Sequence, residues 1–163
     1  MRDMSTGAQS FTGHEGGATA LLQLLESCKR QVRISSLCLT HAIYSEALTV
    51  QALSDFARRS RYSRVEILVS DTTAMYRRPH RLLPLIQRLG SHIQLRCLQD
   101  EHGPEVHEYV VGDDQQVLFV ADPDLWRGTY ELESRQRARK LNEAFSQRWA
   151  QAVEDPNLRQ LQL

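Results

Sequence analysis

This chain of 163 residues lacks any apolar run approaching the roughly 20 residues that a membrane-spanning helix requires. It has only three cysteines, Cys28, Cys38 and Cys97, and no CxxC spacing, which argues against a disulfide framework and against a cysteine-based zinc site. Basic and acidic residues number 20 each, so no excess charge draws the whole chain to nucleic acid or to an anionic membrane. These absences predict a cytoplasmic globular protein with buried thiols.

The length favours a single domain that is large enough to bury a core. Residues 1–17 are polar and rich in small residues, and they lack the apolar core of a signal peptide. We therefore expect a disordered lead-in over residues 1–17, one domain over residues 18–155, and a short tail over residues 156–163.

Apolar periodicity predicts the element order α-β-α-β-α-β-β-β-α after the lead-in. The expected helices cover residues 18–29, 45–59 and 133–153, with a further one starting near Pro79, and the expected strands cover residues 31–39, 64–70, 92–98, 106–111 and 116–121. Alternating strands and helices predict parallel strands joined by crossovers, and the turn Gly112–Gln115 adds an antiparallel hairpin. The expected fold class is α/β, with a mixed, mostly parallel sheet flanked by helices on both faces.

His107 and Asp114 stand seven positions apart in a run with the register of the phosphodiesterase motif H-x-K-x-x-x-x-D, with Tyr109 at the lysine position. The motif falls on a strand that enters a hairpin, and the closing helix directs Phe145 and Trp149 inward. With this element order, the chain from about Ala18 to Val153 resembles one half of the phospholipase D superfamily. The resemblance implies a phospholipase D-like half-domain fold.

The resemblance also implies a chemistry. In that family one histidine attacks phosphorus and forms a phosphohistidine, while the histidine of a second motif protonates the leaving group. This chain has one motif, so activity would require a homodimer. His107 and Asp114 are the catalytic candidates that the resemblance provides, and the corresponding activity is that of a phosphodiesterase or nuclease that uses His107 from each subunit.

The chain departs from the family pattern where a phosphate would bind. Tyr109 replaces the lysine, and Ala121, Asp122 and Asp124 stand where family enzymes carry Gly-Ser and Asn. Removing one donor from such a site typically costs about 10²–10³ in rate, and added carboxylates repel the substrate. We therefore favour a non-catalytic phospholipase D-like domain that acts as a binding or regulatory module in a homodimer, with the phosphodiesterase as the alternative.

A basic segment after the second expected strand offers a ligand site. It contains Arg77, Arg78, His80 and Arg81. Ligands of open α/β sheets tend to bind outside the carboxyl ends of the strands, where His41 follows the first strand. Together with Tyr109, His41 and the arginines are expected to bind an anionic ligand or nucleic acid. A sensor domain for a small anion is a further hypothesis for this segment, and a solvated surface loop is the other interpretation.

Two further features remain open at this level. Trp126, beside Arg127, suits either stacking on a partner or packing under its loop. His102 and His107 match no standard metal spacing with Asp100 or Glu105, so we expect neither a metal nor a cofactor.

Overall fold

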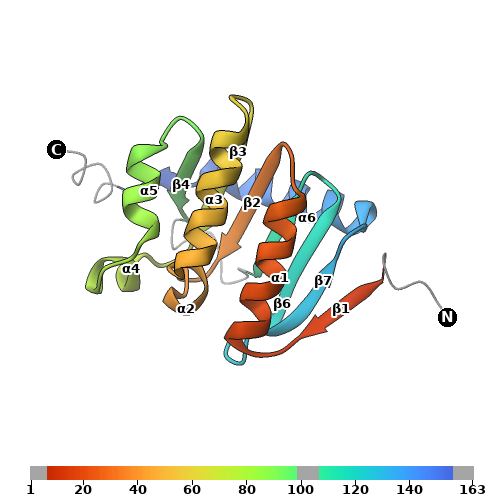
Figure 1. Ribbon diagram of the computed structural model, residues 1–163. Helices are drawn as coiled ribbons and strands as arrows, with labels where there is room; N and C mark the ends of the chain where they lie inside the picture. The colour runs from red at the N-terminus through yellow and green to blue at the C-terminus, as the bar shows by residue number, and fades with distance from the viewer. Residues whose placement is uncertain (1–6, 99–106, 156–163) are drawn as a thin grey trace.

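The computed structural model describes residues 7–98 and 107–155, so the expected tail over residues 156–163 lies outside the described part. The described residues form an eight-stranded sheet with the order β1-β7-β6-β5-β2-β3-β4-β8 (Figure 1). The strands are β1 (Ala8–Phe11), β2 (Gln31–Ser36), β3 (Arg64–Val69), β4 (Ile93–Cys97), β5 (Glu108–Gly112), β6 (Gln116–Asp122), β7 (Arg127–Glu131) and β8 (Val153–Glu154). The helices are α1 (Gly13–Ser27), α2 (His41–Tyr44), α3 (Ala47–Arg59), α4 (Thr73–Arg77), α5 (Leu82–Arg88) and α6 (Arg135–Gln151).

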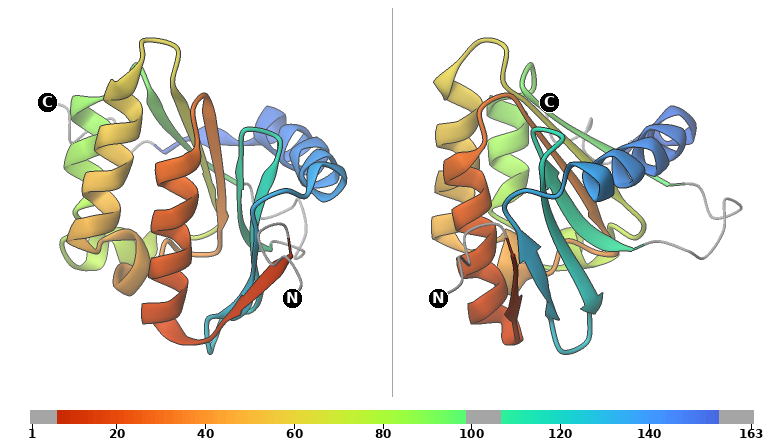
Figure 2. Two further views of the ribbon diagram at one scale, coloured as in Figure 1. Left: turned by 45° about the vertical axis from the view of Figure 1, so that its right-hand side comes forward. Right: turned by 90° about the vertical axis from the view of Figure 1, so that its right-hand side faces the viewer.

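The sheet separates two layers of unequal thickness. Helices α1, α3 and α5 cover one face, while α6 lies across the other (Figure 2). The larger core lies beneath the first group, where Leu24, Ile34, Phe56 and Ile67 are fully buried. The smaller cluster beneath α6 is centred on Tyr109, Val117 and Phe145. No helix in the described ranges is long and apolar enough to cross a membrane.

The mixed α/β class with helices on both faces is confirmed, but the sheet is not mostly parallel. Strand β3 pairs in parallel with β2 and β4. The remaining pairings are antiparallel, because β5, β6 and β7 return on one another in hairpins and the short strands β1 and β8 pair at the two edges. Crossover helices account only for the parallel strands β2, β3 and β4.

A disordered lead-in was expected over residues 1–17, but residues 8–17 contain strand β1 and the start of helix α1. Strand β1 pairs antiparallel with β7, from Ala8 opposite Glu131 to Phe11 opposite Gly128, and α1 begins at Gly13. Three of the four β1 residues are exposed, so the strand carries almost no apolar signal. It is held by backbone pairing with β7, which lies outside the strands expected from the sequence.

The helical segments also differ in detail from expectation. The helix expected over residues 45–59 is α3, which begins at Ala47, and the separate short helix α2 precedes it. Between them, the Ser45 hydroxyl accepts a hydrogen bond from the Arg81 backbone N–H at 2.9 Å. Thr73–Arg77, outside the helices expected from the sequence, form α4. Pro84 lies in the first turn of α5, where a helix tolerates proline because that backbone nitrogen needs no intrahelical acceptor. In α6, Phe145 is buried and Trp149 is half-buried, as expected for the inward face of this helix.

Candidate functional site

His107 lies immediately before β5 and is exposed. Its carbonyl oxygen accepts a hydrogen bond from the Ser35 hydroxyl at 2.8 Å, which joins it to β2. Its ring lies 5.8 Å from the Phe119 ring, centre to centre, and within the described residues no hydrogen bond reaches the ring. In the described part of the chain, therefore, no carboxylate holds the imidazole in one tautomer, as nucleophilic attack requires.

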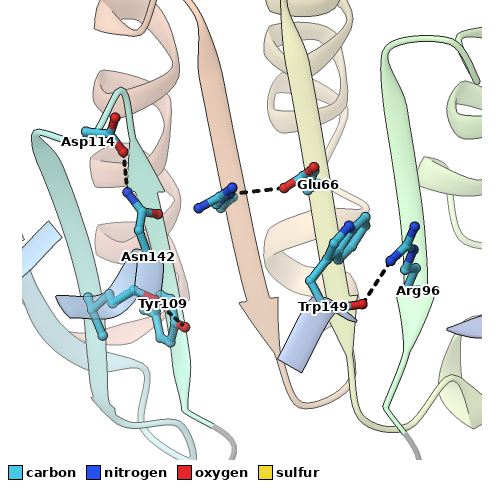
Figure 3. Close-up of polar contacts among 8 residues, drawn as sticks. Glu66, Arg96, Tyr109, Asp114, Asn142 and Trp149 are labelled. Carbon is cyan, nitrogen blue, oxygen red and sulfur yellow. Dashed lines mark hydrogen bonds and ion pairs between the residues drawn. The ribbon is translucent and has the colours of Figure 1, made fainter. Parts of the chain in front are cut away.

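Tyr109, which the resemblance aligns with the lysine of the phosphodiesterase motif, points into the cluster beneath α6 (Figure 3). Its ring stacks on Phe119 at 6.3 Å with an interplanar angle of 12°, and its hydroxyl donates to the Leu141 carbonyl at 3.4 Å. The residue is 3% exposed, and burial raises the pKa of the phenol above its ordinary value. A neutral, packed ring thus stands where the family motif places a cation.

Asp114 lies in the β5–β6 turn, at the other end of β5 from His107. Strand β5 lies between the two and by itself spans roughly 16 Å, so the structure does not bring them together. The Asn142 side-chain amide of α6 donates to the Asp114 carboxylate (Figure 3). Asp114 therefore connects the hairpin turn to the closing helix.

Asp113 is the structural aspartate of this turn. Its carboxylate accepts hydrogen bonds from the backbone N–H groups of Lys29, Arg30 and Gln31 at 2.7, 2.8 and 3.0 Å. Asp113 and Asp114 have φ angles of 53° and 58°, the left-handed pair of a type I′ hairpin turn. The predicted hairpin is confirmed, and its first aspartate joins the turn to the start of β2.

Glu108 was missed by the sequence analysis. It alternates with Tyr109 and so faces the larger core, where it is 3% exposed and accepts a hydrogen bond from the Leu37 backbone N–H at 3.0 Å. Burial raises the pKa of Glu108, and burial together with the nearby Glu108 charge raises that of Tyr44. The signal was available, because strict alternation along an apolar strand places Glu108 opposite Tyr109.

Two of the expected ligand residues, His41 and Arg78, lie side by side, and Arg81 contacts Ser45 at the end of α2. The His41 Nε2 atom lies 3.4 Å from the Arg78 carbonyl oxygen. The Arg81 guanidinium donates to the Ser45 carbonyl at 3.3 Å, beside α2. Arg77 ends the neighbouring helix α4, and all three arginines are exposed.

His80 belongs to the same segment but is 3% exposed. Its Nδ1 atom accepts the Leu82 backbone N–H at 3.2 Å, so the Nε2–H donates to the Leu39 carbonyl at 2.9 Å and the ring is neutral. Burial lowers the pKa of His80. Leu39 has a φ of 55°, and this bond helps to hold the loop between β2 and α2 in that left-handed conformation.

The loop between β6 and β7 is packed. Trp126 is buried, with ring centres 6.5 Å from Phe11 and 6.2 Å from Tyr44, so the packing interpretation holds. The Asp122 carboxylate accepts the backbone N–H groups of Asp124 and Leu125 at 3.1 and 3.3 Å. Asp122, one of the carboxylates that the resemblance led us to expect near a phosphate, therefore stabilises a turn.

Comparison with known proteins bears on both the fold and the family. The family model described as "Domain of unknown function (DUF7931)" matches residues 14–161, which is most of the chain. The chain belongs to the DUF7931 family. No curated protein matches the DUF7931 chain.

Among solved structures, the DUF7931 chain is similar to a phospholipase D family member, Nuc from Salmonella typhimurium, with a TM-score of 0.64, 13% identity, and coverage of 91% of this chain and 98% of Nuc. It is similar to NucT from Helicobacter pylori, with a TM-score of 0.65, 12% identity and the same coverage values. It is also similar to TrmBL2, an archaeal chromatin protein with a novel mode of DNA binding.

For TrmBL2 the TM-score is 0.67 at 13% identity, and the match covers 91% of this chain and 53% of TrmBL2, so the DUF7931 chain spans about half of that protein. At such identities these likenesses establish the fold alone. The DUF7931 chain has a phospholipase D-like fold, as the element order and the position of His107 predicted.

Proposed function

We propose that this chain is a non-catalytic phospholipase D-like domain that works as a binding or regulatory module. The observation that supports this most strongly is Tyr109, a buried neutral ring stacked on Phe119 at the position where the family motif has lysine. Phosphoryl transfer needs cationic or donor groups around the charge that develops on phosphorus. Tyr109 directs its hydroxyl at the Leu141 carbonyl, so it supplies neither charge nor a free donor.

The motif's aspartate supports the same proposal. Asp114 is bound by Asn142 at the far end of β5 and cannot orient His107 from there. Of the three motif positions, only His107 has an exposed side chain that makes no hydrogen bond with the described residues. It functions here as a residue at the edge of a binding surface.

The ligand of this module is an anion that binds Arg77, Arg78, Arg81 and His41. The three guanidinium groups are exposed at the carboxyl side of β2 and β3, where α/β sheets bind ligands. Guanidinium groups bind phosphate in a bidentate geometry. A nucleic-acid ligand is consistent with the DNA binding stated for the structurally similar TrmBL2.

The module works as a homodimer, because the phospholipase D-like arrangement pairs two half-domains and this chain supplies one. Light scattering coupled to size-exclusion chromatography should give the mass of two chains. A single-chain mass at every protein concentration would contradict the dimer.

Catalysis is tested with a chromogenic phosphodiester, bis(p-nitrophenyl) phosphate. We expect no hydrolysis above buffer by the wild type, by His107→Ala or by His107→Gln, with a phosphodiesterase of known activity as positive control. Wild-type hydrolysis that disappears in both His107 variants would overturn the proposal and establish the phosphodiesterase alternative.

Ligand binding is tested by calorimetry with inorganic phosphate and with a short oligonucleotide. The variant Arg77→Gln/Arg78→Gln/Arg81→Gln should bind at least about tenfold more weakly, since it loses three charge-assisted contacts. Arg58→Gln/Arg61→Gln/Arg88→Gln removes the same charge from exposed positions elsewhere and should bind normally. Equal affinity of the two triple variants would remove Arg77, Arg78 and Arg81 from the site.

A further inference from the structure

Helix α6 concentrates positive charge in an otherwise neutral chain. Its 17 residues include five basic residues and one acidic residue, Glu143, whereas the whole chain has 20 basic and 20 acidic residues. The basic residues are Arg135, Arg137, Arg139, Lys140 and Arg148. Local potential rather than net charge decides whether a surface attracts a polyanion.

Three of these cations are engaged within the domain, and one of them, Arg135, donates from its guanidinium to the Gln115 side-chain oxygen at 2.9 Å. Arg137 forms an ion pair with Glu131 at 2.7 Å and lies over the Phe119 ring at 4.8 Å. Arg148 is half-buried, and its charge acts on the phenol of Tyr109. Arg135, Arg139 and Lys140 are exposed, and no acidic group of the described residues lies within 4.0 Å of their charged nitrogens.

A groove of about 520 Å³ runs between α6 and the β5–β6 turn. Arg135, Arg139, Asn142 and Ser146 line it from one stripe of the helix, because they are spaced by three or four residues. Glu143 and Asp114 also line it, and the amide of Asn142 already binds Asp114. The groove thus presents two guanidinium groups beside a hydroxyl and an amide, together with two carboxylates, of which that of Asp114 is already bound by Asn142.

Asn142 indicates that a ligand of this groove also needs a hydrogen-bond donor. The residue is 9% exposed, and its Oδ1 atom is buried without a hydrogen-bond partner among the described residues. A buried amide oxygen without a donor costs about 1–3 kcal/mol. A phosphate alone cannot satisfy it, because a phosphodiester has no donor, whereas a sugar hydroxyl or a base amino group can.

We propose that the α6 groove binds a nucleic-acid strand, with its phosphates on Arg135 and Arg139, which line the groove, and on the exposed Lys140 next to them in the helix, and with a sugar or base donor on the Asn142 amide oxygen. A lipid surface fits less well, since interfacial helices present large apolar side chains to the bilayer. None of the large exposed apolar side chains in the described ranges belongs to α6, and Trp149 is covered by the Arg96 guanidinium at 4.4 Å.

This surface differs from the site of the proposed function. Helix α6 lies on one side of the sheet, whereas α4 and α5, which flank Arg78 and Arg81, lie on the other (Figure 2). The two surfaces can therefore be disabled separately. A strand bound at α6 requires neither catalysis by His107 nor an anion at Arg77, Arg78 and Arg81.

The test is fluorescence anisotropy of labelled single-stranded DNA and RNA of mixed sequence. Arg135→Gln/Arg139→Gln/Lys140→Gln should weaken binding at least about tenfold and flatten the salt dependence, since each lost phosphate contact removes about 0.7 from the log–log slope. Arg58→Gln/Arg61→Gln/Arg88→Gln makes the same change in net charge away from α6 and should bind like the wild type. Circular dichroism and thermal unfolding confirm that the variants are folded.

Three outcomes would overturn the inference. The first is that the wild-type protein binds neither the DNA nor the RNA strand. The second is that the α6 triple variant binds these strands as tightly as its matched control. In the third, phosphatidylserine vesicles bind in an α6-dependent way and nucleic acid does not. Loss of binding only in Arg77→Gln/Arg78→Gln/Arg81→Gln would refute the α6 site while supporting the proposed function, so the two failures are distinguishable.

Discussion

The backbone N–H of Leu37 donates to the Glu108 carboxylate at 3.0 Å, which ties the end of β2 to the first residue of β5. Glu108 is buried on one face of the sheet, and Tyr109 is buried on the other. The start of the motif strand is therefore enclosed on both faces, and only His107 just before it is exposed.

Glu108→Gln should stabilise the domain at neutral pH by about 1 kcal/mol, because it removes a buried charge while leaving an acceptor for Leu37. Burial raises the folded-state pKa of Glu108 above the ordinary value of 4.5, so the folded state binds the proton more tightly than the unfolded state. In the wild type, the buried Glu108 charge lowers the free energy of unfolding at pH values above the folded-state pKa. This destabilisation disappears as the pH falls toward 4.5. Urea denaturation at neutral and mildly acidic pH measures this; destabilisation by the variant at neutral pH would refute it.

Acid should destabilise the domain through His80. Burial lowers its folded-state pKa below the ordinary 6.5, so the unfolded chain takes up the proton first and stability declines as pH falls below about 6.5 toward the folded pKa. His80→Gln keeps a donor for Leu39 and should lose this acid-dependent component. His14→Gln changes an exposed histidine and should keep it. Identical pH profiles for wild type and His80→Gln, by chemical denaturation, would contradict the assignment.

Asp113→Ala should cost about 3 kcal/mol of unfolding free energy. It leaves the backbone N–H groups of Lys29, Arg30 and Gln31 without their shared acceptor, and hydrogen bonds to charged groups each contribute about 1.5–3 kcal/mol. Asp114→Ala, at the neighbouring left-handed position, loses a single bond from Asn142 and should cost less. Guanidinium unfolding curves compare them, and an equal loss in both variants would argue against the role of Asp113.

Replacing Tyr109 should distinguish its contribution to stability from the effect that a lysine at this position has on phosphodiesterase activity. Tyr109→Phe keeps the stack on Phe119 and loses a weak bond of 3.4 Å, so the expected cost is below about 1 kcal/mol. Tyr109→Lys introduces the lysine of the phosphodiesterase motif but buries an ammonium group beneath α6. We therefore expect the free energy of unfolding to fall by about 3 kcal/mol and no phosphodiesterase activity to appear. Thermal unfolding and the chromogenic assay provide the readouts; activity in a folded Tyr109→Lys protein would show that the lysine alone was missing.

Local patterns were enough for the elements that carry the motif. Alternation and turn residues placed the β5–β6 hairpin, and helical periodicity placed α6, because both depend on residues near one another in the chain. Strands β1, β7 and β8 were not predicted. They are short and polar or exposed, and pairing with distant strands holds them in the sheet.

The candidate site divides in the same way. The sequence by itself determined the register of His107 and Asp114, the tyrosine in place of lysine, and the basic segment after β3. Only the tertiary structure decided that Tyr109 is packed beneath α6, that Asp114 binds Asn142, and that His41 meets Arg78. The physical reason is that side-chain direction and burial depend on contacts between segments tens of residues apart, which the covering helices and the pairing of the sheet create.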